Sequence, residues 1–175
     1  MSKTETVAAM RFIGTPNLAS MLDENQSLTS AWNELIQSGV LADLDTLAEQ
    51  QQVAKNRSTL IVFSPYAFVA WVGVLVPADT PVPKGLNHFD LPAGLTAVAQ
   101  QNANMQLPLP LNHLIGGTLE KFEKAGISLP AHLGQTDRPY FVESYEMSPK
   151  GEIVSVMQRV YLGQSTDNDD ETYLD

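Results

Sequence analysis

A carboxylate lies in the middle of an otherwise apolar strand face. The segment RPYFVESYEM, residues 138–147, is rich in aromatic side chains, a composition typical of strands. Alternation along this strand puts Phe141, Glu143, Tyr145 and Met147 on one face. A buried carboxylate without a partner is costly or becomes protonated. The pattern therefore predicts that Glu143 has either a charged partner or a shifted pKa.

Two kinds of partner suit Glu143. A lipophilic cation could neutralise the carboxylate, with each cation–π contact to a ring contributing roughly 0.5–2 kcal/mol. The rings for such contacts would come from Tyr145, Phe141 and Trp71. Alternatively, Glu143 forms a structural ion pair with Arg138 or Arg159 or lies at a solvated edge, since ion pairs perturb carboxylates as readily as active sites do. From the residues alone, the ion pair is the simpler interpretation.

Further aromatic residues are candidates for ligand contacts. In the segment 66–76, alternation puts Trp71 and Val69 on one face and Tyr66 and Phe68 on the other. Trp32 lies on the apolar stripe of an expected helix. Aromatic side chains at such positions belong to the core more often than to a binding site.

The remaining reactive residues show no catalytic or metal-binding pattern. His88, His113 and His132 lack metal-ligand spacing, and Ser64 and Ser144 lack the context of a nucleophile elbow. The chain has no cysteine, which excludes disulfides, thiolate zinc sites and cysteine nucleophiles. We expect no metal and no cofactor.

Composition restricts the class of protein. The chain has 175 residues, 43% of them hydrophobic, which suits one domain with a real core. A net charge of −10 argues against nucleic acid as a partner, and the longest apolar run is far shorter than the roughly 20 residues that span a membrane. The start of the chain lacks a secretory signal, so we expect a cytoplasmic protein. We assign residues 1–163 to a single domain and the acidic end, 164–175, to a disordered tail.

Hydrophobic periodicity predicts the same order of elements twice. Each pass is strand, helix, strand, strand, with repeat one at about 5–80 and repeat two at about 85–163. Residues 14–16 are expected to be a turn that ends the first strand, and residues 82–90 a loop before the second repeat. Gly116 and Gly117 lie inside the expected helix of the second repeat, which predicts close backbone packing there.

Three short motifs follow one another along the chain: Pro83 with Gly85, the run Leu91-Pro92-Ala93-Gly94, and Glu143 with Tyr145. In this order they resemble the GyrI-like small-molecule-binding family, which includes the effector-binding domains of AraC-type and MerR-type multidrug regulators. The resemblance implies an α+β fold in which two pseudo-symmetric strand-helix-strand-strand repeats form a concave antiparallel sheet groove with helices packed on it. No helix-turn-helix pattern precedes the first strand, so we expect a stand-alone member.

The resemblance also implies a function. Glu143 would lie on the floor of the groove and face a cationic or polar part of the ligand, with the aromatic residues Tyr145, Phe141, Trp71, Tyr66, Phe68 and Trp32 as further contacts. The first hypothesis is a protein that senses or sequesters lipophilic cations. A second is a hydrolase of electrophilic, cyclopropanoid-type toxins with Glu143 as the catalytic residue. A third is a gyrase-inhibitor-like module that binds another protein. The sequence does not determine the oligomeric state.

Overall fold

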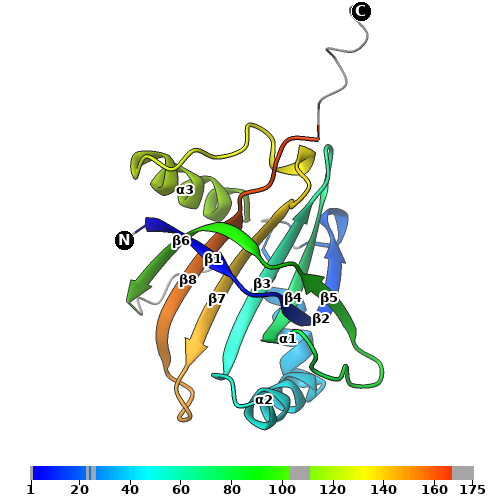
Figure 1. Cartoon of the computed structure of the whole chain (residues 1–175). Coiled ribbons are helices and arrows are strands. Elements are labelled where there is room, and N and C mark those ends of the chain that lie inside the picture. Colours follow the sequence, from blue (N-terminus) through cyan, green and yellow to red (C-terminus); the bar gives the residue numbers. More distant parts are fainter. Residues whose placement is uncertain (1, 23, 25–26, 103–110, 167–175) are drawn as a thin grey trace, which may run out of the picture.

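The computed structural model describes residues 2–22, 24, 27–102 and 111–166. Within them the chain forms an eight-stranded, wholly antiparallel sheet in the order β1-β6-β8-β7-β3-β4-β2-β5 (Figure 1). The strands are β1 (Ser2–Val7), β2 (Met10–Leu18), β3 (Asn56–Phe63), β4 (Phe68–Pro77), β5 (Asn87–Leu91), β6 (Gly94–Asn102), β7 (Tyr140–Met147) and β8 (Ile153–Tyr161).

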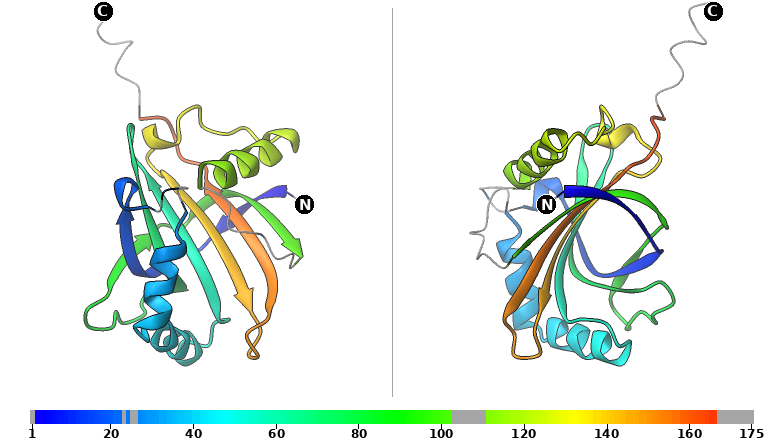
Figure 2. Two further views of the ribbon diagram at one scale, coloured as in Figure 1. Left: turned by 180° about the vertical axis from the view of Figure 1, so that it is seen from behind. Right: turned by 60° about the vertical axis from the view of Figure 1, so that its left-hand side comes forward.

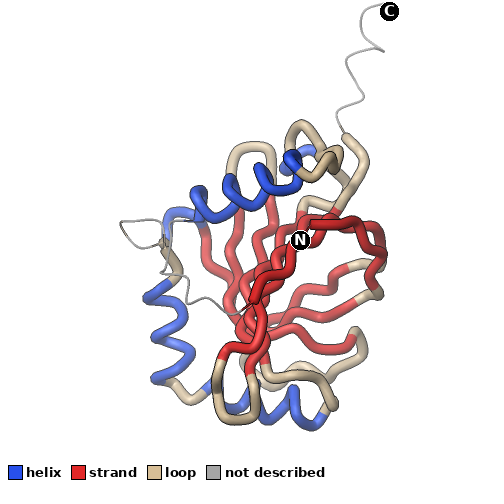
Figure 3. The backbone as a smooth tube through the Cα atoms, turned by 90° about the vertical axis from the view of Figure 1, so that its left-hand side faces the viewer, coloured by secondary structure: helices blue, strands red, loops and turns tan. Residues whose placement is uncertain are grey.

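The α-helices lie on one side of this curved sheet (Figure 3). They are α1 (Thr29–Gln37), α2 (Val40–Gln50) and α3 (Leu111–Lys124), and two short 3-10 turns cover Ala19–Met21 and Leu133–Gln135. Helices α1 and α2 pack against β4, whereas α3 packs against β6 and β1. The central strands β3, β7 and β8 therefore run between α1 and α3 (Figure 2). The predicted α+β class, with helices packed on an antiparallel sheet, is confirmed.

The two halves of the sheet exchange their first strands. Chain order is β1, β2, α1, α2, β3, β4 and then β5, β6, α3, β7, β8. From the middle of the sheet outwards, one side reads β3-β4-β2-β5 and the other reads β7-β8-β6-β1. Strand β1 thus pairs with the second half, and β5 pairs with the first. Each half depends on a strand that the other half supplies.

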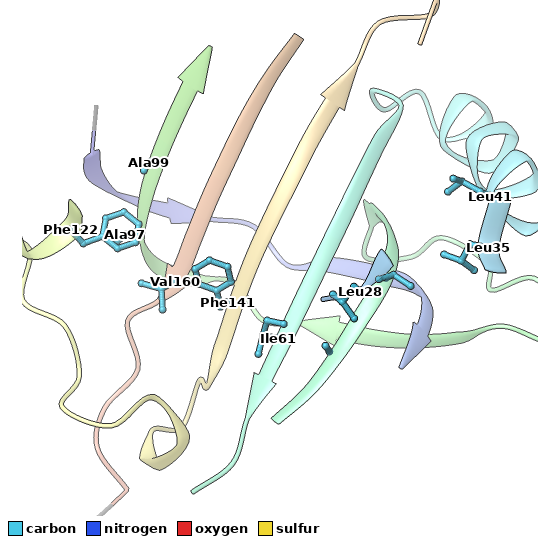
Figure 4. Close-up of a cluster of buried hydrophobic side chains, with 11 residues drawn as sticks. Leu28, Leu35, Leu41, Ile61, Ala97, Ala99, Phe122, Phe141 and Val160 are labelled. Carbon is cyan, nitrogen blue, oxygen red and sulfur yellow. The ribbon is translucent and has the colours of Figure 1, made fainter. Parts of the chain in front are cut away.

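Buried apolar clusters cover both faces of the sheet. On the helix-bearing face, Leu28 and Leu35 from the region of α1 join Ile61, Phe141 and Val160 from the central strands, and Phe122 of α3 belongs to the same cluster (Figure 4). The opposite face buries a second cluster without any helix, formed mainly by Phe12, Leu60, Trp71, Leu75, Leu91, Val142 and Tyr161. The central strands therefore contribute apolar side chains to a buried cluster on each face, and a carboxylate buried within either cluster needs a partner.

Two predicted boundaries were wrong. Strand β2 does not end in a turn at Gly14 but continues through Pro16 to Leu18. Beyond Gly14, β2 pairs with β4 alone, so Pro16 lies where one side of the strand is an edge and its missing N–H leaves no ladder bond unmade. The expected loop at 82–90 contains most of β5, a largely exposed strand whose side chains give little apolar alternation.

The double glycine of α3 does not support close packing. A Cβ atom added at Gly116 or Gly117 would meet no atom of the described residues within 4 Å. Because glycine in a helix interior is less stable than alanine by about 1 kcal/mol, we expect Gly117→Ala to stabilise the fold by about that amount. Urea unfolding of the variant measures the change. A loss of stability would show that the glycine has a packing role after all.

The first residues of the expected acidic tail make backbone contacts with the rest of the protein. Gln164 accepts a backbone hydrogen bond from Asp137 at 3.0 Å, Thr166 donates one to Gln135 at 2.7 Å, and Ser165 forms a bridge with Thr136. These three residues therefore belong to the folded body, and the rest of the expected tail, 167–175, lies outside the described residues. No described helix is long and apolar enough to cross a membrane.

Candidate functional site

Glu143 lies in a row of paired residues that crosses the helix-bearing face. In β7 it pairs with Thr59 of β3 on one side and with Gln158 of β8 on the other. Beyond them the row continues through Val72 of β4 and Ala99 of β6. The next row along the strands contains Phe141, Ile61 and Val160, all fully buried. The carboxylate therefore lies beside the apolar cluster between α1 and α3.

The carboxyl group of Glu143 is almost removed from solvent. The residue is 5% exposed, and Gln158, its neighbour, is 3% exposed. Gln158 Nε2 donates a hydrogen bond of 2.9 Å to Glu143 Oε2, and the Tyr145 hydroxyl also interacts with the carboxylate. Burial raises the pKa of Glu143, and the contacts with Gln158 and Tyr145 and the charge of Lys121 only partly oppose this effect. Burial and the nearby Glu143 together raise the pKa of Tyr145.

The structural ion pair expected as the simpler interpretation is absent. Arg138 Nη1 donates to the carbonyl of Ala93 at 2.8 Å, and Arg159 donates to Thr96 and Glu5 from the opposite face of the sheet. None of the ion pairs among the described residues involves Glu143. The carboxylate is thus buried against an amide and a hydroxyl, and no cationic side chain among the described residues forms an ion pair with it.

The structure brings five of the seven candidate residues to the same face as the acid. Phe141 is fully buried in the cluster, and Trp32 and Phe68 are partly buried against it. Tyr145 is half-buried two residues beyond Glu143 in β7. With Glu143 itself, these side chains would form an aromatic surface beside a carboxylate.

The other two candidates lie elsewhere. Trp71 is on the opposite face, in edge-to-face contact with Phe12 and Phe89 at ring-centroid distances of 6.2 and 6.0 Å. Tyr66 is fully exposed in the turn between β3 and β4. A ligand in contact with Glu143 therefore cannot reach Trp71 without crossing the sheet, and nothing in the fold directs Tyr66 towards the acid.

Gln158 is the site residue that the sequence interpretation missed. Alternation along EIVSVMQRVYL puts it between Val156 and Val160, both buried, on the helix-bearing face. This is the same signal that drew attention to Glu143, a polar side chain in an apolar row. Thr59, 8% exposed, adds a hydroxyl on the other side of the acid.

The pKa of Glu143 makes a prediction about stability. A carboxyl group whose pKa is higher in the folded state than in the unfolded state binds more protons when the protein is folded. Its contribution to stability is therefore largest below the unfolded-state pKa of 4.5 and is lost as pH rises through the folded-state pKa. Glu143→Gln removes the titration. The stability of the variant relative to the wild type should therefore increase as pH rises from about 4 through the folded-state pKa of Glu143, by about 1.4 kcal/mol for each pH unit by which that pKa exceeds the unfolded value. Urea unfolding of both proteins across this range measures it; a difference that stays constant or decreases with pH would contradict the burial of an uncompensated acid.

Together the fold and this row define an α+β protein with a buried acid–amide pair on the helix-bearing face of its sheet. No protein-family model and no curated protein sequence matches the chain. Solved structures do match it in fold. The protein SAV2435 bound to tetraphenylphosphonium has a TM-score of 0.60 at 12% identity, and the match covers 99% of both chains.

Two other solved structures share the fold. An integron cassette protein from the mobile metagenome of Vibrio cholerae has a TM-score of 0.54 at 10% identity, over 92% of this chain and 95% of its own. The protein EcmrR, in its complex with DNA, has a TM-score of 0.52 at 10% identity, and the match covers 94% of this chain but only 57% of EcmrR. At these identities the likeness establishes the fold alone.

Proposed function

We propose that this protein senses or sequesters lipophilic organic cations, which bind over Glu143 on the sheet face between α1 and α3. One observation carries the proposal. Glu143 is 5% exposed, and no ion pair among the described residues neutralises its carboxyl group. A buried carboxylate of this kind either remains protonated or acquires a counter-charge. A bound cation would supply that charge.

The surroundings of the acid suit the rest of such a ligand. Phe141 is buried next to Glu143, and the partly buried rings of Trp32, Phe68 and Tyr145 lie on the same face. Aromatic faces attract cations, and apolar side chains accept the hydrocarbon part of the ligand. The fold shared with SAV2435, which was solved with tetraphenylphosphonium bound, supports the same class of ligand.

The test uses two ions of the same shape and opposite charge. Tetraphenylphosphonium and tetraphenylborate both present four phenyl rings, so contacts with apolar side chains hardly distinguish them. If Glu143 recognises charge, isothermal titration calorimetry should detect saturable binding of the phosphonium and at least about a hundredfold weaker binding of the borate. Equal affinities would mean that the site selects only for hydrophobic shape.

A hydrolase is the second candidate, favoured by the raised pKa of Glu143 and by the adjacent Tyr145 hydroxyl. A buried carboxyl group with a raised pKa can give and take a proton near neutral pH, acting on water or on an electrophilic ring. Strained electrophiles such as cyclopropanoid natural products would be its substrates. Incubation with such a compound separates the two functions, because an enzyme converts many equivalents of it whereas a binding protein saturates at a fixed stoichiometry.

A further inference from the structure

Gln158 is a buried polar side chain beside Glu143, and its amide oxygen has no hydrogen-bond partner among the described residues. The amide nitrogen donates to Glu143 Oε2 at 2.9 Å, whereas Gln158 Oε1 is buried and accepts no hydrogen bond from any described residue. The residue as a whole is 3% exposed. An amide oxygen left without a donor in such surroundings costs free energy comparable to a lost hydrogen bond.

The direction of the amide follows from the acid beside it. With a cation bound, Glu143 is ionised and can only accept hydrogen bonds, so the Gln158 amide then presents its nitrogen to Glu143 and its oxygen elsewhere. On the other side of Gln158 in the sheet is Ala99, which has no side-chain donor. The geometry therefore presents a carboxylate and an amide oxygen together, two acceptors from adjacent strands.

We propose that the preferred ligand of this site is a protonated amine whose N–H groups bind Gln158 Oε1 as well as the Glu143 carboxylate. The inference rests on the proposed function of the Glu143 site and specifies the chemical class of its ligand. An ammonium ion supplies the positive counter-charge for the Glu143 carboxylate and N–H donors for Gln158 Oε1. A fully substituted onium ion carries the charge alone, so its binding leaves the amide oxygen buried and unpaired.

Methylation of the amine distinguishes these cases. The probes are 4-phenylbenzylammonium and its N,N,N-trimethyl counterpart, which share one aromatic body and one positive charge. The trimethyl ion is easier to desolvate and should bind better to a merely apolar, acidic surface. If Gln158 accepts a hydrogen bond from the ligand, calorimetry should instead show the primary ammonium binding at least about tenfold more tightly.

A pair of glutamine variants assigns the preference to its residue. Gln158→Met keeps a side chain of similar length but removes the amide oxygen, so the ratio of the two affinities should fall to about one or reverse. Gln100→Met is the matched control, because Gln100 is exposed on the opposite face of the neighbouring strand β6. Melting curves of both variants establish that each is folded before binding is measured.

The outcomes separate the inference from the function on which it rests. A tenfold preference for the primary ammonium that Gln158→Met abolishes and Gln100→Met retains supports the proposal. Equal or tighter binding of the trimethyl ion by the wild type overturns it and leaves the Glu143 cation site standing. A preference that survives in Gln158→Met also overturns it. Failure of both cations to bind would overturn the cation site and the inference together.

Discussion

Replacement of Glu143 by glutamine is expected to weaken the binding of tetraphenylphosphonium by about tenfold to a hundredfold while leaving the fold intact. The substitution keeps the size and hydrogen-bonding capacity of the side chain and removes its charge. Only the charged form compensates a bound cation, and interactions with a charged partner in a buried site contribute about 1.5–3 kcal/mol. A neutral ligand of similar shape, such as triphenylphosphine oxide, should bind both proteins with similar affinity.

The matched control is Glu146→Gln. Glu146 lies three residues further along β7 on the opposite face, is exposed, and accepts a hydrogen bond from Ser155. Its replacement removes the same formal charge from the protein, so it separates a local effect from a change in net charge. Calorimetry on the three proteins measures the affinities. If Glu146→Gln weakens phosphonium binding as much as Glu143→Gln does, the carboxylate of Glu143 does not contact the ligand.

The face that carries Glu143 could be predicted from the sequence because alternation within one strand is a local property. The same property places Gln158 between Val156 and Val160, although the glutamine was not singled out. Trp71, which was expected beside Glu143 but lies on the opposite face, shows the limit of this reasoning. Alternation states which residues of a strand share a face, but only the pairing register and the position of each strand in the sheet decide which face that is. Trp71 pairs with Leu60, not with a residue of the Glu143 row.

The failure to predict strand β5 from the sequence has a different cause. β5 leaves His88 and Asp90 exposed and buries only Leu91 fully, and as the last strand of the sheet it pairs on one side only. An edge strand of five residues leaves almost no apolar pattern in the sequence. Its role is visible only in its partners, since it pairs with β2 and Arg11 binds Asp90 at 2.7 Å.

The exchange of β1 and β5 predicts that neither half of the protein folds alone. A fragment of residues 1–84 lacks β5, which pairs with its β2, and β7, which pairs with its central strand β3. A fragment of residues 85–175 lacks β1, the partner of β6, as well as β3. Each fragment would expose apolar residues that the intact chain buries, such as Leu60 or Phe141. We therefore expect each fragment alone to be unfolded or aggregated, without a cooperative thermal transition.

The two fragments should recover the fold when they are refolded together, because every strand then finds its partner. Circular dichroism and a cooperative melt of the mixture measure the recovery, and phosphonium binding reports whether the row containing Glu143 has re-formed. A protease site inserted between Lys84 and Gly85, both exposed, provides the control, since cleavage there in the folded chain removes no strand. A single fragment with a sharp transition of its own would show that the halves are independent units and that the exchanged strands contribute little. Fragments that remain unfolded after mixing, beside a cleaved chain that stays folded, would show that the connection between β4 and β5 must be intact for the sheet to form.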